Sequence, residues 1–387
     1  MKKRIYLDNA ATTRIDPRVL DAMIPFFNET YGNASSMHDF GTKAKVALHN
    51  SRKTIAGAIH AEPEEIIFTS SGTEANNLAV KGVALANRSK GNHIIVSSIE
   101  HDCILNTAHW MEEQGFRVTY LRVDSSGIVE PKLLERLIRP DTILVSVMHV
   151  NNEIGTVQPL REIGQVCHRY GVLLHSDACQ SFGKIPINVL TQNIDLLTLN
   201  AHKMYGPKGV GALFIRKGIN IKAMMHGGGQ ESGLRSSTEN IPAIAGFAKA
   251  TELCLEEMES ESKRIKAMRD YLTNYLFQNY EDFYINGSQE QRLYNNLNFS
   301  FHGLEGETIR LLLLLDELGV AVSAGSACSS NDKSNNASHV LQAIGLNQFE
   351  ARGAVRVSFG RYNTMDEVKN FTEIIGSVVG QLNSIFS

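Results

Sequence analysis

Two residues at the ends of predicted strands could act together on amino acids. Asp177 ends the apolar run in VLLHSDACQ, and Lys203 follows the next run in LLTLNAHKMYGPKG. A lysine between His202 and Met204 in apolar surroundings suits a Schiff base, which needs a deprotonated amine. A carboxylate at a strand end can hold a protonated heterocyclic nitrogen. The pair is therefore typical of a pyridoxal phosphate (PLP) site. Taken alone, Asp177 is equally explained as a helix N-cap, and for a lone Lys203 solvent exposure is the commoner role.

A small-residue segment, TSSGTEANN, follows the predicted strand 65–69 and opens a helix at about Gly72. Small residues allow close backbone approach, and a helix N-terminus offers free N–H groups to a phosphate. Ser71 and Glu74 also fit a capping box, so ordinary capping explains the same residues.

Cys328 lies in VSAGSACSSNDKSNN, among small and polar residues instead of a core stripe. A thiol in such a segment suits covalent chemistry, and an inert exposed cysteine is the plain alternative. Five cysteines in 387 residues do not form a disulfide scaffold, and no C-x-x-C pair occurs. We therefore expect a reduced compartment and no metal site.

Three further polar residues stand in suggestive contexts. His101 in SSIEHDCIL could serve in acid–base work or stack on a ring, although a single histidine is more often structural. Asn152 follows a strand end in HVNNEIG. Arg356, on a predicted strand in AVRVSFGR, could bind a substrate carboxylate with two parallel hydrogen bonds, although surface ion pairs are the commoner role of arginine.

The elements that must position these residues alternate between short apolar strands and helical patterns, such as 160–170. Continuous Val/Ile/Leu strands separated by helices favour an α/β fold with a mostly parallel sheet covered on both faces. The predicted strands of this sheet are 65–69, 94–98, 118–121, 142–149, 172–175, 196–200 and 212–215.

A long amphipathic run without internal proline begins at about residue 242 and is expected to link two domains. Beyond it, strands near 297–300 and 355–358 and a closing helix from about 365 predict a smaller α+β unit. We expect a large domain at 15–260 and a small domain made of 1–14 and 261–387, which carries Cys328.

Composition excludes several classes of protein. Apolar residues make up 43% and charged residues 20%, which is an ordinary globular mixture and not that of a disordered chain. A net charge of -3 gives no basic surface for nucleic acid or membrane. The start, MKKRIYLDNAATT, has no signal-peptide apolar stretch, and the apolar run 311–315 is far shorter than the ~20 residues of a membrane helix. A soluble cytoplasmic protein is expected.

Taken together, the motifs resemble those of the cysteine desulfurases of the NifS/IscS type, in the class V aminotransferase family of fold-type I PLP enzymes. The resemblance covers nearly the whole chain, and fold type I implies a large domain with a mostly parallel seven-stranded sheet. The segments that carry it are YLDNAATT, YGNASS, TSSGTEANN, EHDCIL, HVNNEIGTVQP, HSDACQSFGKIP, AHKMYGPKGVGAL, HGGGQESGLRSST, SAGSACSS and AVRVSFGRYNT.

The resemblance implies a role for each matching residue. Lys203 binds PLP covalently, Asp177 pairs with the ring nitrogen, and His101 stacks on the ring and helps to move protons. By the same resemblance, Gln180 contacts the ring's phenolic oxygen, and the phosphate is bound by Gly72, Thr73, Asn200 and His202, with Thr238 of the second subunit of a homodimer. Asn152 contacts cofactor and substrate, and Arg356 binds the substrate carboxylate, with Asn33 nearby. Cys328 matches the mobile nucleophile.

The implied reaction converts L-cysteine to L-alanine and leaves the sulfur on Cys328 as a persulfide. The sulfur then passes to an acceptor protein for iron–sulfur clusters, thio-cofactors or tRNA thiolation. Two alternatives remain open. One is another class V enzyme, an aminotransferase or a selenocysteine lyase-like protein. The other is a sulfur relay partner without turnover.

Three residues depart from the family pattern, and we expect none of them to abolish the chemistry. Asn200 stands where a phosphate-binding serine is usual, so the phosphate cradle is expected to be rearranged. Ser232 replaces a common arginine. Ser237 replaces the glycine of the usual R-S-G-T, so a different turn before Thr238 is expected.

Overall fold

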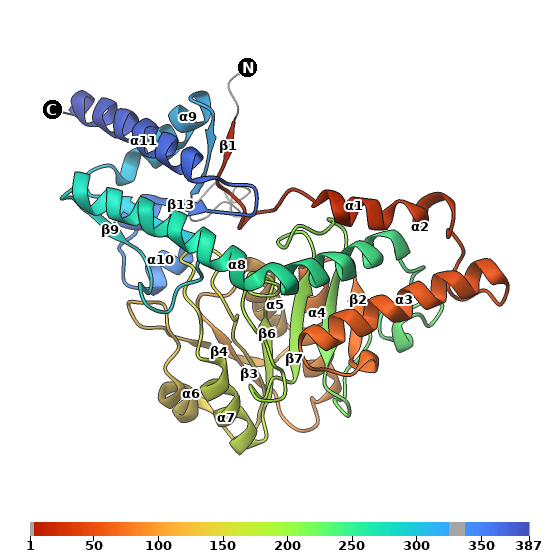
Figure 1. Ribbon diagram of the computed structural model, residues 1–387. Coiled ribbons are helices and arrows are strands. Elements are labelled where there is room, and N and C mark those ends of the chain that lie inside the picture. Colours follow the sequence, from red (N-terminus) through yellow and green to blue (C-terminus); the bar gives the residue numbers. More distant parts are fainter. Residues whose placement is uncertain (1–3, 325–336, 387) are drawn as a thin grey trace.

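A mixed sheet forms the centre of the molecule (Figure 1). The computed structural model describes residues 4–324 and 337–386, and the seven strands of this sheet follow the order β2-β8-β7-β6-β5-β3-β4. Neighbours from β7 to β4 are parallel, whereas β8 is antiparallel to both β2 and β7. The predicted mostly parallel sheet is confirmed. Its strands are β2 (Ile66–Thr69), β3 (His93–Ser97), β4 (Arg117–Leu121), β5 (Thr142–Ser146), β6 (Leu173–Asp177), β7 (Leu196–Asn200) and β8 (Gly211–Ile215).

Helices cover both faces of this sheet, because successive strand side chains point to opposite sides. Val145 and Leu197 pack on the face covered by α3, α7 and the first half of α8. Leu144 and Leu196 pack on the opposite face, against α4 and α5. The longer helices of these layers include α3 (Asp39–Ala58), α4 (Gly72–Ala86), α5 (Asp102–Glu113) and α7 (Leu160–Tyr170).

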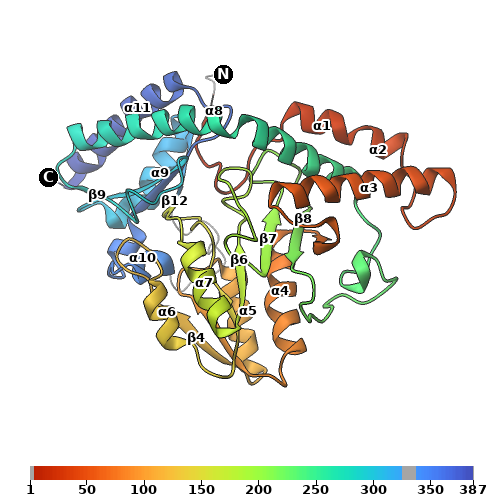
Figure 2. The same ribbon diagram turned by 60° about the horizontal axis from the view of Figure 1, so that its bottom comes forward.

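A second apolar core surrounds a smaller antiparallel sheet of order β12-β13-β10-β9. Helix α8 runs past both cores (Figure 2): Phe247 is buried in the first and Leu272 in the second. The elements of this part are α8 (Ile241–Asn279), β9 (Phe283–Ile285), β10 (Asn296–Phe301), α9 (Thr308–Glu317), β12 (Ser323–Ala324), α10 (His339–Ala343), β13 (Ala354–Ser358) and α11 (Met365–Phe386).

The N-terminal strand belongs to this second core. Strand β1 (Ile5–Tyr6) pairs in parallel with β11 (Val320–Ala321), and Ile5 and Leu7 are buried among residues from the last third of the chain. The chain then crosses to the first core through short helices. The remaining elements are α1 (Pro17–Met23), α2 (Pro25–Asn28), α6 (Pro131–Leu137) and the 3-10 helices Pro63–Glu65, Glu231–Gly233, Glu305–Glu307 and Glu350–Arg352.

Most predicted elements lie within a residue or two of the observed ones. The helix predicted at 160–170 has the observed bounds, because Gly171 ends it in the left-handed conformation at φ 65°. The strand predicted at 142–149 is shorter and ends at Ser146. No helix in residues 4–324 or 337–386 is long and apolar enough to cross a membrane.

Candidate active site

The predicted site residues gather where the strands of the large sheet end. Asp177 ends β6 and Asn200 ends β7, and the turn after β7 carries Lys203. His101 follows β3, and Gly72 follows β2. Ligands of open α/β sheets bind at this carboxyl edge of the strands.

Asp177 is a buried carboxylate with a defined donor on each oxygen. The Asn76 amide donates to Oδ2 at 2.7 Å, and the backbone N–H of Cys179 donates to Oδ1 at 2.8 Å. Burial alone raises the pKa of the Asp177 carboxyl, but these donors outweigh it and the pKa is lowered. Asp177 therefore stays ionised in a site where only 5% of the residue is exposed.

His101 caps helix α5 with its ring. The backbone N–H of Cys103 donates to Nδ1 at 3.2 Å, so Nδ1 is an acceptor and the proton of the neutral ring is on Nε2. Burial lowers the pKa of His101, and the charge of Lys203 lowers it further. The site thus presents a neutral imidazole with one N–H donor.

The start of α4 forms a cradle for an anion. Its first backbone N–H groups lack acceptors within the helix and form the positive end of the helix dipole. A Cβ on Gly72 would lie only 2.6 Å from Sγ of Cys179, so the close packing of this sulfur requires glycine at the start of the helix. Nδ2 of Asn200 lies 3.3 Å from Nε2 of His202, which places both residues beside each other. Burial lowers the pKa of His202 to about 4, which keeps its ring neutral.

The predicted capping box at this helix is only half formed. The N–H of Glu74 donates to Oγ of Ser71 at 3.1 Å, as expected. The Glu74 carboxylate, however, accepts from the backbone N–H of Ser70 at 2.8 Å, because it lies against Arg235 at 2.9 Å.

Arg356 lies on β13 and is almost completely buried, with 3% exposed. Its Nη1 donates to the backbone oxygen of Asn152 at 3.0 Å, and its Nη2 to Oδ1 of Asp8 at 2.8 Å. Nε is buried and has no acceptor among the described residues. Burial raises the pKa of the Asp8 carboxyl, and the nearby charges of Arg356 and Lys203 oppose this effect. An anionic group that reaches Nε would satisfy this open donor.

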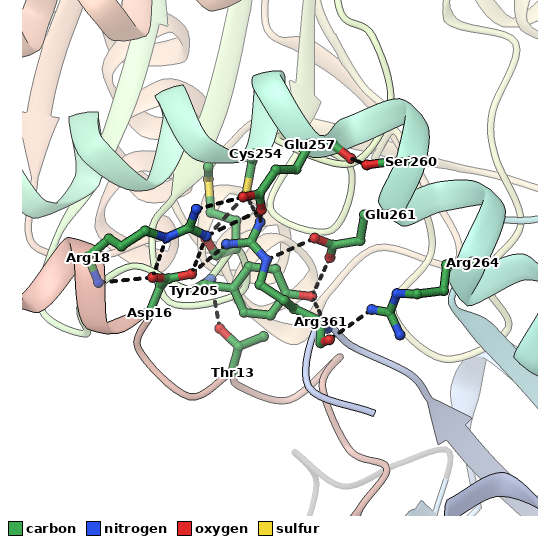
Figure 3. Close-up of polar contacts among 11 residues, drawn as sticks. Thr13, Asp16, Arg18, Tyr205, Cys254, Glu257, Ser260, Glu261, Arg264 and Arg361 are labelled. Atoms are coloured by element: carbon green, nitrogen blue, oxygen red, sulfur yellow. Dashed lines mark hydrogen bonds and ion pairs between the residues drawn. The ribbon is translucent and has the colours of Figure 1, made fainter. Parts of the chain in front are cut away.

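A cluster of ion pairs holds the turn that follows Lys203 (Figure 3). The hydroxyl of Tyr205 donates to Glu261 at 2.9 Å and accepts from the backbone N–H of Arg361 at 2.7 Å. Arg361 in turn contacts Asp16, Glu257 and Glu261 within 2.9 Å. The cluster therefore joins the N-terminal segment, the lysine turn, α8 and the segment after β13.

The other predicted residues are less closely connected. Gln180 is buried and donates to the backbone oxygen of Ala10 at 2.9 Å. Thr73, Asn33 and Thr238 are exposed, and no hydrogen bond links them to another predicted site residue within the described ranges. Ser237 has φ 128°, which is a glycine-like backbone conformation. The residue type therefore departs from the family pattern, whereas the backbone does not lose its glycine-like φ. Cys328 lies outside the described residues.

Sequence reasoning missed Asp8, Asn76 and Tyr205, although all three lie inside the motifs YLDNAATT, TSSGTEANN and AHKMYGPKG. Their positions in those motifs were the available signal. Their partners lie on other strands and helices, and spacing along the chain does not predict such contacts.

These residues fit PLP. The helix N-terminus at Gly72 suits a phosphate, the ionised Asp177 suits a protonated ring nitrogen, and Lys203 supplies an amine at the same edge of the sheet. The open Nε of Arg356 suits a carboxylate on the substrate.

Comparisons with known proteins agree with this chemistry. The aminotransferase class-V family model matches residues 5–371. A Dictyoglomus turgidum protein, cysteine desulfurase IscS, is 47% identical over 385 residues, which cover 100% of this chain and 97% of that protein. A solved NifS-like protein has a TM-score of 0.91 at 39% identity and covers 97% of this chain and 99% of its own. SspA in complex with cysteine has a TM-score of 0.81 at 39% identity, covering 93% and 100%. The chain therefore belongs to the aminotransferase class-V family and, within it, to the cysteine desulfurases of the NifS/IscS type.

Proposed function

We propose that this chain is a PLP-dependent cysteine desulfurase that converts L-cysteine to L-alanine and takes the sulfur onto Cys328. The observation that carries the proposal is that Asp177 and Lys203 follow neighbouring strands of the large sheet, while Arg356 on β13 pairs with Asp8, a carboxyl that also feels the charge of Lys203, in a chain 47% identical to a cysteine desulfurase. Each of these groups serves a different part of an amino acid reaction, and an aminotransferase would need no Cys328.

PLP, when bound, supplies an electron sink for the substrate's Cα. Asp177 would hold the ring nitrogen through its ionised carboxylate, and the α4 N-terminus with His202 would hold the phosphate. Gln180 would bind the phenolic oxygen. His101 would contact the ring with Nε2–H as a donor, and Lys203 would bind the cofactor and move a proton at the substrate's Cα.

Arg356 binds the carboxylate of L-cysteine through its open Nε edge, with Asn152 beside it and Asn33 nearby. Because Nη1 and Nη2 already have acceptors, the guanidinium is fixed before substrate arrives. A positioned guanidinium recognises the planar carboxylate of any amino acid, so the choice of cysteine depends on the sulfur step.

In that step the thiolate of Cys328 attacks the substrate sulfur. A sulfur–sulfur bond forms while the substrate's carbon–sulfur bond breaks, and its electron pair goes to the carbon side, which takes up a proton. The products are a persulfide on Cys328 and L-alanine. A second nucleophile, on an acceptor protein, then takes the terminal sulfur and restores the Cys328 thiolate.

The same proposal covers the oligomeric state, the domain division and the cellular location of the protein. Two copies form a homodimer in which Thr238 of one subunit reaches the phosphate of the other; exposed Leu20, Ile24 and Phe27 offer apolar surface for such a contact. The chain divides into a large domain, 15–260, and a small domain, 1–14 with 261–387. The protein is cytoplasmic, which the unpaired cysteines of the described ranges support, and its acceptor serves iron–sulfur, thio-cofactor or tRNA synthesis.

Intact mass tests the sulfur step. PLP-loaded protein exposed briefly to L-cysteine without reductant should gain the mass of a sulfur atom, release alanine and lose the added mass on reduction. Cys328→Ser should do neither. Cys167→Ser, which removes a buried thiol far from the cofactor residues, should behave as the parent protein does. Alanine release by Cys328→Ser at the parent rate would contradict the proposal and favour another class V activity.

Borohydride trapping tests the lysine. Lys184 is the natural competitor for Lys203, because it is buried behind the site and burial lowers its pKa to about 8. Reduction followed by peptide mapping should place the cofactor on Lys203. Lys184 donates to the backbone oxygen of Gln180 at 2.9 Å, so a structural role accounts for it. Cofactor found on Lys184 would overturn the assignment.

A further inference from the structure

A continuous line of polar contacts connects Asp177 and His101, the two side chains proposed to contact the PLP ring. Asn76, on α4, donates from Nδ2 to Asp177 at 2.7 Å, and the same nitrogen lies 3.2 Å from Sγ of Cys103. Sγ of Cys103 lies 3.2 Å from Nδ1 of His101. Asn76 and Cys103 therefore stand between Asp177 and His101, on helices that start from different strands.

The direction of every hydrogen bond in this line is fixed by its chemistry. The amide of Asn76 has two N–H bonds, one for the Asp177 carboxylate and one for the cysteine sulfur. The Cys103 S–H is then left to donate to Nδ1 of His101, which already accepts the backbone N–H of Cys103. The line leaves the proton of the neutral imidazole on Nε2.

We propose that Asn76 and Cys103 are positioning residues that hold the Asp177 carboxylate and the His101 ring in a fixed relation to each other. The inference rests on the proposed function, since both ends act on PLP. Asn76 orients the carboxylate plane and supplies a neutral donor, and the Cys103 thiol adds a second donor to Nδ1 of His101 beside the backbone N–H. Neither residue touches the substrate.

The same line explains why a second thiol near the cofactor does not compete with Cys328. Burial raises the pKa of Cys103 to about 12, and the negative charge of Asp177 adds to that effect. The thiol therefore keeps its proton and acts as a donor. Cys103 is a structural thiol inside the site and does not accept the sulfur of the substrate.

Asn76→Asp tests the Asn76 half, because it nearly preserves shape and replaces the donor by a carboxylate oxygen. Asn77→Asp is the matched control: it adds the same charge one residue along α4, where the side chain contacts Thr107 and the backbone oxygen of Thr73 instead of Asp177. In PLP-loaded protein, Asn76→Asp should lose cofactor during dialysis about tenfold faster and change its visible circular dichroism, because Asp177 loses a donor. Asn77→Asp should stay within about twofold of the parent.

Asn76→Ser keeps the proposal testable if Asn76→Asp does not fold, since it is neutral and too short to reach Asp177. Retention and circular dichroism like those of the parent in the folded variant would overturn the role of Asn76. A parent protein that never binds PLP would instead overturn the proposed function, so the two failures are distinguishable.

Cys103→Ala and Cys103→Ser test the other half. The alanine variant removes the side-chain donor to Nδ1, whereas serine retains an O–H. We expect kcat to fall about tenfold in Cys103→Ala with KM unchanged, and serine to restore most of it. The ¹⁵N shift of His101 Nδ1 should change in the alanine variant only. An alanine variant with parental kcat and parental ¹⁵N shifts would overturn the role of Cys103.

Discussion

Asp8 and Arg356, which are 348 positions apart in the chain, form an ion pair in which Oδ1 of Asp8 accepts from Nη2 of Arg356 at 2.8 Å. The contact connects the segment after the first strand to β13. The guanidinium nitrogen Nε has no acceptor within the described ranges. The N-terminal segment thereby determines which edge of Arg356 faces an incoming carboxylate.

Asp8→Ala should raise KM for L-cysteine about tenfold with a smaller effect on kcat, because an unheld guanidinium loses its orientation. Asp8→Asn keeps an oxygen that accepts from Nη2, so its KM should stay within about threefold of the parent value. Steady-state kinetics of both variants provide the measurement. Equal KM increases in the two variants would show that charge matters and the hydrogen bond does not.

Arg361→Met should lower the free energy of unfolding by about 3 kcal/mol, because it removes the buried cation shared by Asp16, Glu257 and Glu261. Arg18 is a matched control, since it contacts Asp16 and Glu257 of the same cluster but its side chain is 48% exposed, against 11% for Arg361. Arg18→Met should cost less than about 1 kcal/mol. Urea unfolding of both variants checks the difference, and equal losses would refute the importance of burial.

The ionisation of Glu100 makes the free energy of unfolding depend on pH, and the direction of this dependence follows from its raised pKa. Burial raises its pKa to about 8, so the folded protein keeps a proton that the unfolded chain releases near pH 4.5. Stability from this group is complete below the unfolded pKa and is lost as pH rises toward 8. Glu100→Gln cannot ionise, so its stability relative to the parent should increase between these values by up to about 1.4 kcal/mol per pH unit.

The measurement is urea unfolding of parent and Glu100→Gln at several pH values. The side chain accepts from Ser97 and from the backbone N–H of Met148, and glutamine retains an acceptor oxygen for both. A stability difference that is constant across the range would mean that Glu100 ionises alike in both states.

Gly72→Ala should lower stability by about 1 to 3 kcal/mol, because the new methyl group overlaps the buried Sγ of Cys179. Cys179→Ala removes that sulfur, so the double variant should recover most of the loss. A double-mutant cycle measured by thermal unfolding tests the coupling. Additive losses would show that the crowding at Gly72 comes from another neighbour.

The large sheet could be predicted from sequence because its strands are short apolar runs separated by helical periodicity, a local signal. The helix at Leu160–Tyr170 was predicted to the residue for the same reason, with Gly171 marking its end. The start of α4 directly after β2 was also predicted from one motif, because Gly72 and the capping residue Ser71 lie together in the sequence.

Other features of the site depended on residues far apart in the chain. Glu74 fits a capping box by spacing, yet its carboxylate contacts Arg235, from a segment that no local pattern relates to it. From the sequence alone, Asn76 is an ordinary helical asparagine. Its contact with Asp177 is visible only in the folded structure. Contacts of this kind depend on the topology of the sheet, which motif spacing does not encode.

The pairing of β1 with β11 has a consequence for how the chain is made. Ile5 and Leu7 leave the ribosome first but find their core partners only after Val320, Val357 and Leu382 have been synthesised. The layers around the large sheet can assemble while translation continues, whereas the first strand must wait with its apolar side chains uncovered. A chain released early would therefore expose that strand, which makes premature termination a direct route to aggregation and to capture by chaperones.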